Sequence, residues 1–285
     1  MENTAPIVLV HGFWHGTWCW SSVIEELASR GLAAVAVDLE GHGLNSRAPA
    51  ARWVRPFDPA GYATEPSPSA AVTLSAATEL LAERVRRIGR GEPCLVVAHS
   101  MGGAVATALA ERFPELVAGV VYVTAFAPTA GLPATAYITM PENTGTMVGD
   151  QLAADPMAVG ALRFDTGDST RHAALVETFF GDVPAEVAAA AISLLSSDAP
   201  AGMAAEPFTA TAARYGRLPH TYVVCEQDNA IRPDLQRRFI REIDAIAAEP
   251  TTVVTLDASH SPFLSQPAAL VDAIEKAQYA ADRTR

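Results

Sequence analysis

The sequence predicts a mostly parallel α/β fold, because short apolar runs alternate with amphipathic helical segments along its 285 residues. The apolar runs are rich in valine and isoleucine and lie at residues 6–10, 33–38, 93–98, 116–124, 220–225 and 251–256. Each run is continuously apolar instead of alternating, which is typical of parallel strands covered on both faces. We therefore expect a doubly wound sheet of about six strands with helices on both faces.

Three segments between these runs carry apolar residues at helical spacing. The stripes consist of Leu74, Ala77, Leu81, Val85 and Ile88; of Leu235, Phe239, Ile243 and Ile246; and of Ala269, Leu270, Ala273, Ile274 and Ala277. Each stripe predicts a helix that packs one face against the sheet.

Two stretches interrupt the alternation. Residues 47–72 contain five prolines and are predicted to form a long loop. Residues 128–216 carry no convincing strand but hold alanine-rich helical segments, of which residues 185–195 are the clearest. Since ligands bind at the carboxyl ends of strands in open α/β sheets, we interpret residues 128–216 as a helical cap over a site. The core is then formed by residues 1–127 and 217–285.

Composition excludes several classes of function. A formal charge of −12 argues against nucleic-acid binding, and no apolar run approaches the roughly 18 residues that cross a bilayer. The three cysteines are an odd number without metal-ligand spacing, and two of them, Cys94 and Cys225, fall on predicted strands. The first residues lack a signal-peptide pattern, so we expect a cytoplasmic protein without disulfides or metal, unless an export signal has been removed.

The clearest chemical motif is a serine between a strand and a helix. Residues 96–103 read Val-Val-Ala-His-Ser-Met-Gly-Gly, and a helical pattern follows. This is a nucleophile elbow, small-x-Ser-x-Gly, in which a strained turn exposes the hydroxyl of Ser100 above the sheet. Ala98 replaces the usual first glycine but is still small. A helix that begins at Met101 would direct its positive end at the site. The alternative is a glycine-rich turn with an incidental serine.

The serine needs a base, and His260 fits best among seven histidines. It follows the last predicted strand in a loop of small residues. The others lie in glycine-rich turns, in the elbow, in the cap or at the start of a strand: His11, His15, His42, His99, His172 and His220.

A carboxylate must orient that imidazole, and Asp228 follows the strand at 220–225. Glu226 and Asp257 are rivals, because both lie near the same edge. The chain order Ser100, Asp228, His260 is that of the α/β-hydrolase fold.

Ester hydrolysis also needs hydrogen-bond donors for the oxyanion, each contributing roughly 3 kcal/mol to the transition state. Residues 11–16, His-Gly-Phe-Trp-His-Gly, follow the first strand and can present the amide of Phe13. The amide of Met101 would be its partner. A plain strand-to-helix turn is the alternative.

Together these residues resemble the plant methylesterase and hydroxynitrile lyase branch of the α/β hydrolases. The matching stretches are residues 11–20, 41–43, 98–103, 123–126 and 226–228, of which the tryptophan-rich first is the most specific. The resemblance implies the same catalytic triad and no cofactor. The lyases of this branch place a threonine after the first histidine and a lysine after the catalytic one, where this chain has Gly12 and Ser261. It is thus similar to the esterase members, and secondary-metabolite methylesterases of bacteria share the pattern.

We therefore expect a serine hydrolase that cleaves a carboxylic ester, a methyl ester being one candidate, through an acyl-enzyme. Gly12, Trp14 and Phe126 would line an apolar pocket for a small-molecule substrate of medium size or aromatic character. The cap offers further pocket candidates, of which at least half must be ordinary core: Tyr137, Met140, Met147, Met157, Phe164, Phe179, Phe180, Met203 and Phe208. A lyase, cyclase or acyl-transfer step, or a receptor-like binding role, are the alternatives. Exposed cap helices would suit a homodimer.

Overall fold

The computed structural model describes residues 4–283. Its centre is a six-stranded sheet in the order β2-β1-β3-β4-β7-β8, in which every neighbouring pair is parallel. The strands are β1 (Ile7–Val10), β2 (Ala34–Val37), β3 (Cys94–His99), β4 (Val117–Val123), β7 (His220–Cys225) and β8 (Thr252–Leu256). The predicted parallel α/β fold is thus confirmed, and each predicted apolar run contains or overlaps one strand.

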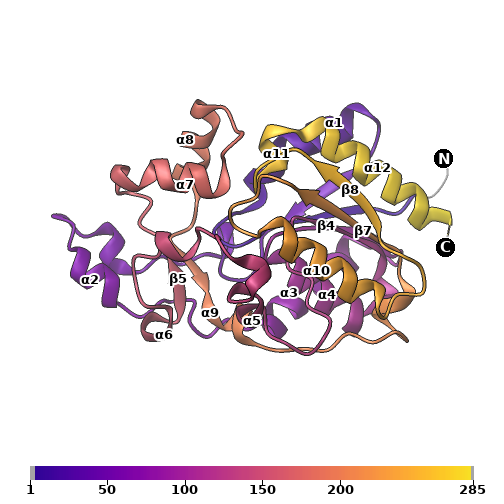
Figure 1. Ribbon diagram of the computed structural model, residues 1–285, viewed down its shortest axis with the longest axis horizontal. Helices are drawn as coiled ribbons and strands as arrows, with labels where there is room; N and C mark the ends of the chain where they lie inside the picture. The colour runs from indigo at the N-terminus through magenta and orange to yellow at the C-terminus, as the bar shows by residue number, and fades with distance from the viewer. Residues whose placement is uncertain (1–3, 284–285) are drawn as a thin grey trace.

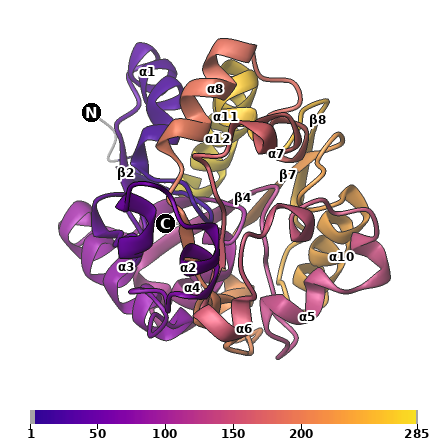
Figure 2. The ribbon, with the colours of Figure 1, turned by 90° about the vertical axis from the view of Figure 1, so that its left-hand side faces the viewer.

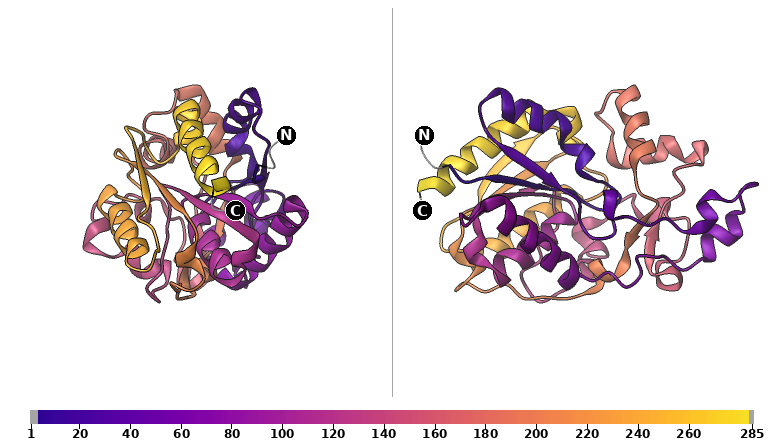
Figure 3. Two further views of the ribbon diagram at one scale, coloured as in Figure 1. Left: turned by 90° about the vertical axis from the view of Figure 1, so that its right-hand side faces the viewer. Right: turned by 180° about the vertical axis from the view of Figure 1, so that it is seen from behind.

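Helices cover both faces of this sheet (Figure 1). One face packs against α1 (Ser21–Ser29), α11 (Pro262–Ser265) and α12 (Pro267–Arg283), and the other against α3 (Leu74–Gly89), α4 (Gly102–Arg112) and α10 (Pro233–Asp244). Successive residues of β1 enter different cores, since Ile7 packs on one face and Val8 on the other. Figure 3 shows α1 and α12 packed side by side. The all-apolar strands are explained by this double coverage.

Helix α3 illustrates how the sequence sets the helix ends. The Thr73 side chain accepts a hydrogen bond from the Ala76 amide at 3.1 Å, which satisfies one free N–H of the first turn. Arg86 and Arg87 occupy the last turn, where positive charge is favourable. Both arginines therefore complement the negative end of the α3 dipole.

The segment predicted to form the cap, residues 128–216, lies largely beyond the carboxyl ends of the strands (Figure 2). It contains α5 (Ala134–Ile138), α6 (Pro156–Val159), α7 (His172–Phe179), α8 (Ala185–Leu194) and α9 (Ala201–Ala205). It also contains a two-stranded antiparallel sheet of β5 (Ala161–Arg163) and β6 (Asp198–Pro200). The expectation of a strand-free cap was wrong, because strands of three residues are too short to produce a readable pattern.

The proline-rich segment, residues 47–72, is not the plain loop that its composition predicts. It forms a 3-10 helix at Ala50–Trp53 and a short helix, α2 (Pro59–Thr64). Pro59 occupies the first turn of α2, where a missing N–H costs nothing, and the Asp58 side chain accepts from the Ala60 amide at 3.1 Å. Proline therefore starts this helix rather than preventing it.

A buried arginine joins the proline-rich segment to the cap. Arg163 in β5 forms a bidentate pair with Asp198 in β6, with both N···O distances at 2.7 Å. Its remaining guanidinium nitrogen donates to the carbonyl oxygens of Tyr62 and Glu65 at 2.5 and 2.8 Å. Because this side chain is completely buried, all these donors are satisfied within the protein.

None of the helices in residues 4–283 has the length and apolar character needed to span a membrane. Cys94 and Cys225 lie buried in β3 and β7, as their apolar surroundings predict, and Cys19 is buried as well.

Candidate active site

The predicted elbow is a sharp turn between β3 and α4. Ser100 has a φ of +52°, and its carbonyl oxygen accepts the amides of Gly103 and Phe126 at 3.0 Å each. A Cβ on Gly102 would lie 2.3 Å from the His11 carbonyl oxygen, so only glycine fits there. The strained serine and its small neighbours occur as the motif predicts, although the helix begins at Gly102 rather than at Met101.

The loop after β1 passes directly over the serine. A Cβ on Gly12 would lie 2.4 Å from Ser100 Cβ and 3.0 Å from Ser100 Oγ, which shows how close the two backbones are. The next amide along this loop belongs to Phe13. Within residues 4–283, neither the Phe13 N–H nor the Met101 N–H donates a hydrogen bond. Both donors expected for an oxyanion are thus free to bind a ligand.

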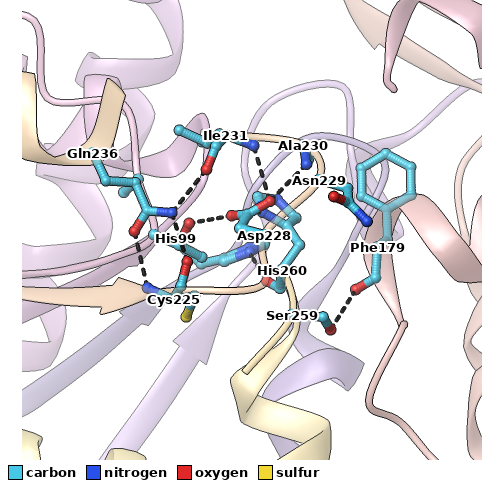
Figure 4. Close-up of polar contacts among 12 residues, drawn as sticks. His99, Phe179, Cys225, Asp228, Asn229, Ala230, Ile231, Gln236, Ser259 and His260 are labelled. Atoms are coloured by element: carbon cyan, nitrogen blue, oxygen red, sulfur yellow. Dashed lines mark hydrogen bonds and ion pairs between the residues drawn. The ribbon is translucent and has the colours of Figure 1, made fainter. Parts of the chain in front are cut away.

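Asp228 and His260 form a buried pair. The distance from His260 Nδ1 to Asp228 Oδ2 is 2.7 Å, and both side chains are almost completely buried. The other carboxylate oxygen accepts the amides of Ala230 and Ile231 at 2.6 and 2.9 Å (Figure 4). Because the carboxylate oxygen accepts from the ring, this hydrogen bond places the imidazole proton on Nδ1 and leaves Nε2 free of that partner.

The rival carboxylates point elsewhere. Glu226 pairs with Arg237 at 2.5 Å, and Asp257 accepts from Gln227 Nε2 at 2.5 Å. Asp228 is therefore the carboxylate that the fold brings to the imidazole.

Ser100 and His260 line the same cavity. Among residues 4–283 no hydrogen bond joins Ser100 Oγ to His260 Nε2. A serine hydroxyl can approach a neighbouring base by rotation about one bond, and such contacts are commonly long in the absence of substrate. Ser100 therefore lies in the same cavity as His260, but the two side chains do not form a hydrogen bond in this structure.

Other histidines surround the site in neutral form. Burial lowers the pKa of His15 to about 3 and that of His42 to about 4, and it lowers the pKa of His99 well below its ordinary value. His99 Nε2 donates to the carbonyl oxygen of His260 at 2.9 Å. His99 therefore supports the backbone that carries the proposed base.

Two further polar side chains lie around Asp228, and neither was predicted from the sequence. The Thr124 hydroxyl bonds to Asp228 Oδ2. Gln236 Nε2 donates to the carbonyl oxygens of Cys225 and Ile231 at 3.1 and 2.7 Å (Figure 4). Gln236 thereby connects the end of β7 to the turn that binds the carboxylate. Its only signal in the sequence is a polar residue next to the apolar stripe of its helix.

The cavity beside Ser100 has a volume of about 110 Å³ and a largely apolar lining. Trp14 and Phe126 line this cavity, while Gly12 lies against the serine itself. Of the cap residues singled out by composition, Phe179 is among the lining residues, whereas Met157 is exposed. Sequence reasoning missed the aliphatic residues that enclose the rest: Ile138, Val148, Leu152, Leu162 and Ile231.

Comparison with known proteins agrees with this architecture. A profile described as "Alpha/beta hydrolase family" matches residues 7–273. A pyrethroid hydrolase from Sphingobium wenxiniae is 30% identical, over 95% of this chain and 87% of its own length. Putative methylesterase 12, chloroplastic, from Arabidopsis thaliana is 27% identical, over 92% of this chain and 68% of its own length. A solved structure of a pyrethroid hydrolase superposes with a TM-score of 0.77 at 23% identity, covering 99% of this chain and 100% of that one. The chain therefore belongs to the α/β hydrolase family, in its methylesterase branch.

Proposed function

We propose that this protein is a serine hydrolase that cleaves carboxylic esters through an acyl-enzyme on Ser100. The observation that carries the proposal is the buried Asp228–His260 hydrogen bond of 2.7 Å beside a strained serine in a shared apolar cavity. The relatives support the same chemistry, since their names describe methylesterases and a pyrethroid hydrolase.

In the first half of the reaction, Ser100 Oγ forms a bond to the ester carbonyl carbon while its proton passes to His260 Nε2. The carbonyl oxygen becomes an oxyanion, which accepts hydrogen bonds from the free amides of Phe13 and Met101. The bond to the alcohol oxygen then breaks, and His260 returns the proton to the departing alcohol. Asp228 stabilises the positive imidazolium between these transfers.

In the second half, water attacks the acyl carbon as His260 Nε2 removes one of its protons. The second oxyanion collapses, the bond to Ser100 Oγ breaks, and the serine regains its proton from His260. The free acid leaves, and the site returns to its initial state.

The cavity also bears on the substrate. Ligand pockets commonly measure about 300–1,000 Å³, whereas the space beside Ser100 is about 110 Å³. We propose that the group seated there is small and apolar, such as the methyl group of a methyl ester or a short acyl chain. This is smaller than the medium-sized group that the composition of the cap suggested.

A lyase reaction that releases cyanide is less well supported. The position after His260 is Ser261, which is uncharged and fully buried, so no ammonium group follows the base there to stabilise a departing anion.

Turnover of p-nitrophenyl acetate, together with labelling by a fluorophosphonate probe, tests this proposal. We expect both in the wild-type protein and neither in Ser100→Ala, with unchanged circular dichroism showing that the variant is folded. Ser265→Ala, which alters a helical serine outside the cavity, should keep both activities. Equal turnover in wild type and Ser100→Ala would refute the assignment of the nucleophile.

A further inference from the structure

Four neighbouring strands end beside the proposed catalytic groups. Ser100 follows β3, Thr124 follows β4, Asp228 lies beyond β7 and His260 lies beyond β8. Three of these four positions already have roles in the proposed mechanism. Thr124 does not, although it lies between them in the sheet.

The backbone at Thr124 is held in an unfavourable conformation. Its φ is +37°, and a β-branched residue rarely adopts positive φ. The Thr124 amide donates to the Val223 carbonyl oxygen at 2.9 Å, and the Tyr222 hydroxyl donates to the Ala125 carbonyl oxygen at 2.6 Å. Such strain persists only where the surroundings enforce it, and it gathers at functional sites.

The side chain of Thr124 uses this conformation to reach Asp228. Its hydroxyl bonds to Oδ2, the same oxygen that accepts His260 Nδ1 at 2.7 Å. An ionised carboxylate can only accept, so the hydroxyl is the donor. With Ala230 and Ile231 on Oδ1, the completely buried carboxylate receives four hydrogen bonds.

We propose that Thr124 is a positioning residue of the ester hydrolase, acting through Asp228 to fix the carboxylate and to moderate its attraction for the proton on His260. The inference rests on the proposed function. A donor on Oδ2 withdraws negative charge from the atom that stabilises the imidazolium. Without that donor the carboxylate is freer to rotate and holds the protonated base more strongly.

The variants Thr124→Val and Thr124→Ser distinguish the contribution of the hydroxyl donor from that of the branched shape of the side chain. Valine keeps the branching and removes the donor, whereas serine keeps the donor. In Thr124→Val we expect kcat to fall by at least tenfold, KM to change little, and the acidic limb of the kcat/KM profile to move upward by about half a pH unit. In Thr124→Ser we expect the acidic limb of the kcat/KM profile to stay at its wild-type position and most of kcat to be retained.

Other titratable or charged groups near the carboxylate must be considered in that profile. Burial raises the pKa of Tyr222 and Cys225 and lowers that of His99 and His15, so these four stay neutral near pH 6–8. Arg232 donates to the Asp228 carbonyl oxygen at 3.0 Å, and Asp182 accepts from the Ser259 hydroxyl. All six groups are unchanged in the Thr124 variants, so they are common to both profiles.

Thr107→Val is the matched control, because it removes another fully buried threonine hydroxyl, one that donates to the Gly103 carbonyl oxygen at 2.8 Å. It should leave the acidic limb in place. A second readout needs no turnover: the downfield proton resonance of His260 Nδ1–H should shift in Thr124→Val and not in Thr107→Val.

The outcomes distinguish the two proposals. If the wild-type protein hydrolyses esters in a Ser100-dependent way but the limb and the resonance are the same in Thr124→Val, Thr124 has no positioning role. If wild type and Ser100→Ala behave alike, the proposed function itself fails. If Thr124→Val does not fold, Thr124→Ser and the wild-type protein still test the inference, since a serine variant with a displaced limb contradicts it.

Discussion

His99 Nε2 donates a hydrogen bond to the carbonyl oxygen of His260 at 2.9 Å, across 161 positions of sequence. Because a carbonyl oxygen can only accept, the proton of the neutral His99 ring lies on Nε2. The two rings are also in contact, with centroids 4.6 Å apart (Figure 4). The residue before the proposed nucleophile thus anchors the loop of the proposed base.

We predict that His99→Leu weakens both folding and catalysis. The buried carbonyl of His260 loses its donor, which should lower the free energy of unfolding by about 1–3 kcal/mol. The loop of the base then becomes less well fixed, so kcat should fall. Urea unfolding and initial rates measure the two effects. His99→Gln, which retains a side-chain N–H donor, should recover part of both; a wild-type kcat in the leucine variant would contradict the prediction.

The buried His220 should make folding sensitive to acid. Burial lowers its pKa from 6.5 to about 4, so the unfolded chain binds a proton that the folded protein does not between these values. The stability contributed by its neutral form is complete above pH 6.5 and is lost as the pH falls toward 4. One such proton corresponds to about 1.4 kcal/mol per pH unit.

His220→Phe tests this prediction far from the active site. Both ring nitrogens of His220 lack a partner among the described residues, and the ring lies 4.3 Å from that of Tyr215. Phenylalanine should therefore be tolerated at pH 7 and should reduce the slope of unfolding free energy against pH below 6.5. His172→Asn, at a partly exposed histidine, is the control. An unchanged slope in His220→Phe would contradict the prediction, because it would mean that folding does not change the protonation of His220 below pH 6.5.

Enlarging the cavity should change the preferred ester. Leu152 and Leu162 both line the space beside Ser100, and replacing either with alanine removes three carbons from its wall. We expect the ratio of kcat/KM for p-nitrophenyl octanoate over acetate to rise by about tenfold. Leu194→Ala, at an exposed leucine, should leave the ratio unchanged. An identical chain-length profile in all three variants would mean that the acyl group binds elsewhere.

The buried pair of Arg163 and Asp198 should dominate the stability of the cap. Asp198→Ala leaves a guanidinium without its counterion in a completely buried position, which costs about 3–5 kcal/mol. Thermal unfolding and limited proteolysis should show the loss first in the cap and residues 47–72. Glu226→Gln removes the carboxylate of the more exposed Glu226–Arg237 pair and should change stability by less than about 1 kcal/mol. Equal effects of the two substitutions would contradict this argument.

The sequence predicted what depends on local pattern. Continuous apolar runs predicted the parallel strands, and the Ser100 motif predicted a strained turn, because both signals are complete within a few neighbouring residues. Asp228 was chosen over Glu226 by chain order, and the structure supplies the distance that separates them. Their chemical roles remain predictions.

The sequence could not predict features that depend on distant partners. The strands β5 and β6 are three residues long and pair across the cap, so neither carries a signal of its own. The cavity wall is made by leucines and isoleucines that look like any core residue until the chain is folded. The roles of His99, Thr124 and Gln236 likewise arise from hydrogen bonds to residues far along the chain.

The guanidinium of Arg163 joins two segments that lie far apart in the chain, since it binds Asp198 in the cap and the backbone of residues 62 and 65 in the proline-rich segment. Recombination between relatives is therefore constrained. A chimera that imports a foreign cap into this scaffold loses Arg163 and Asp198 together, so the carbonyl oxygens of residues 62 and 65 lose their donor unless the imported cap supplies one.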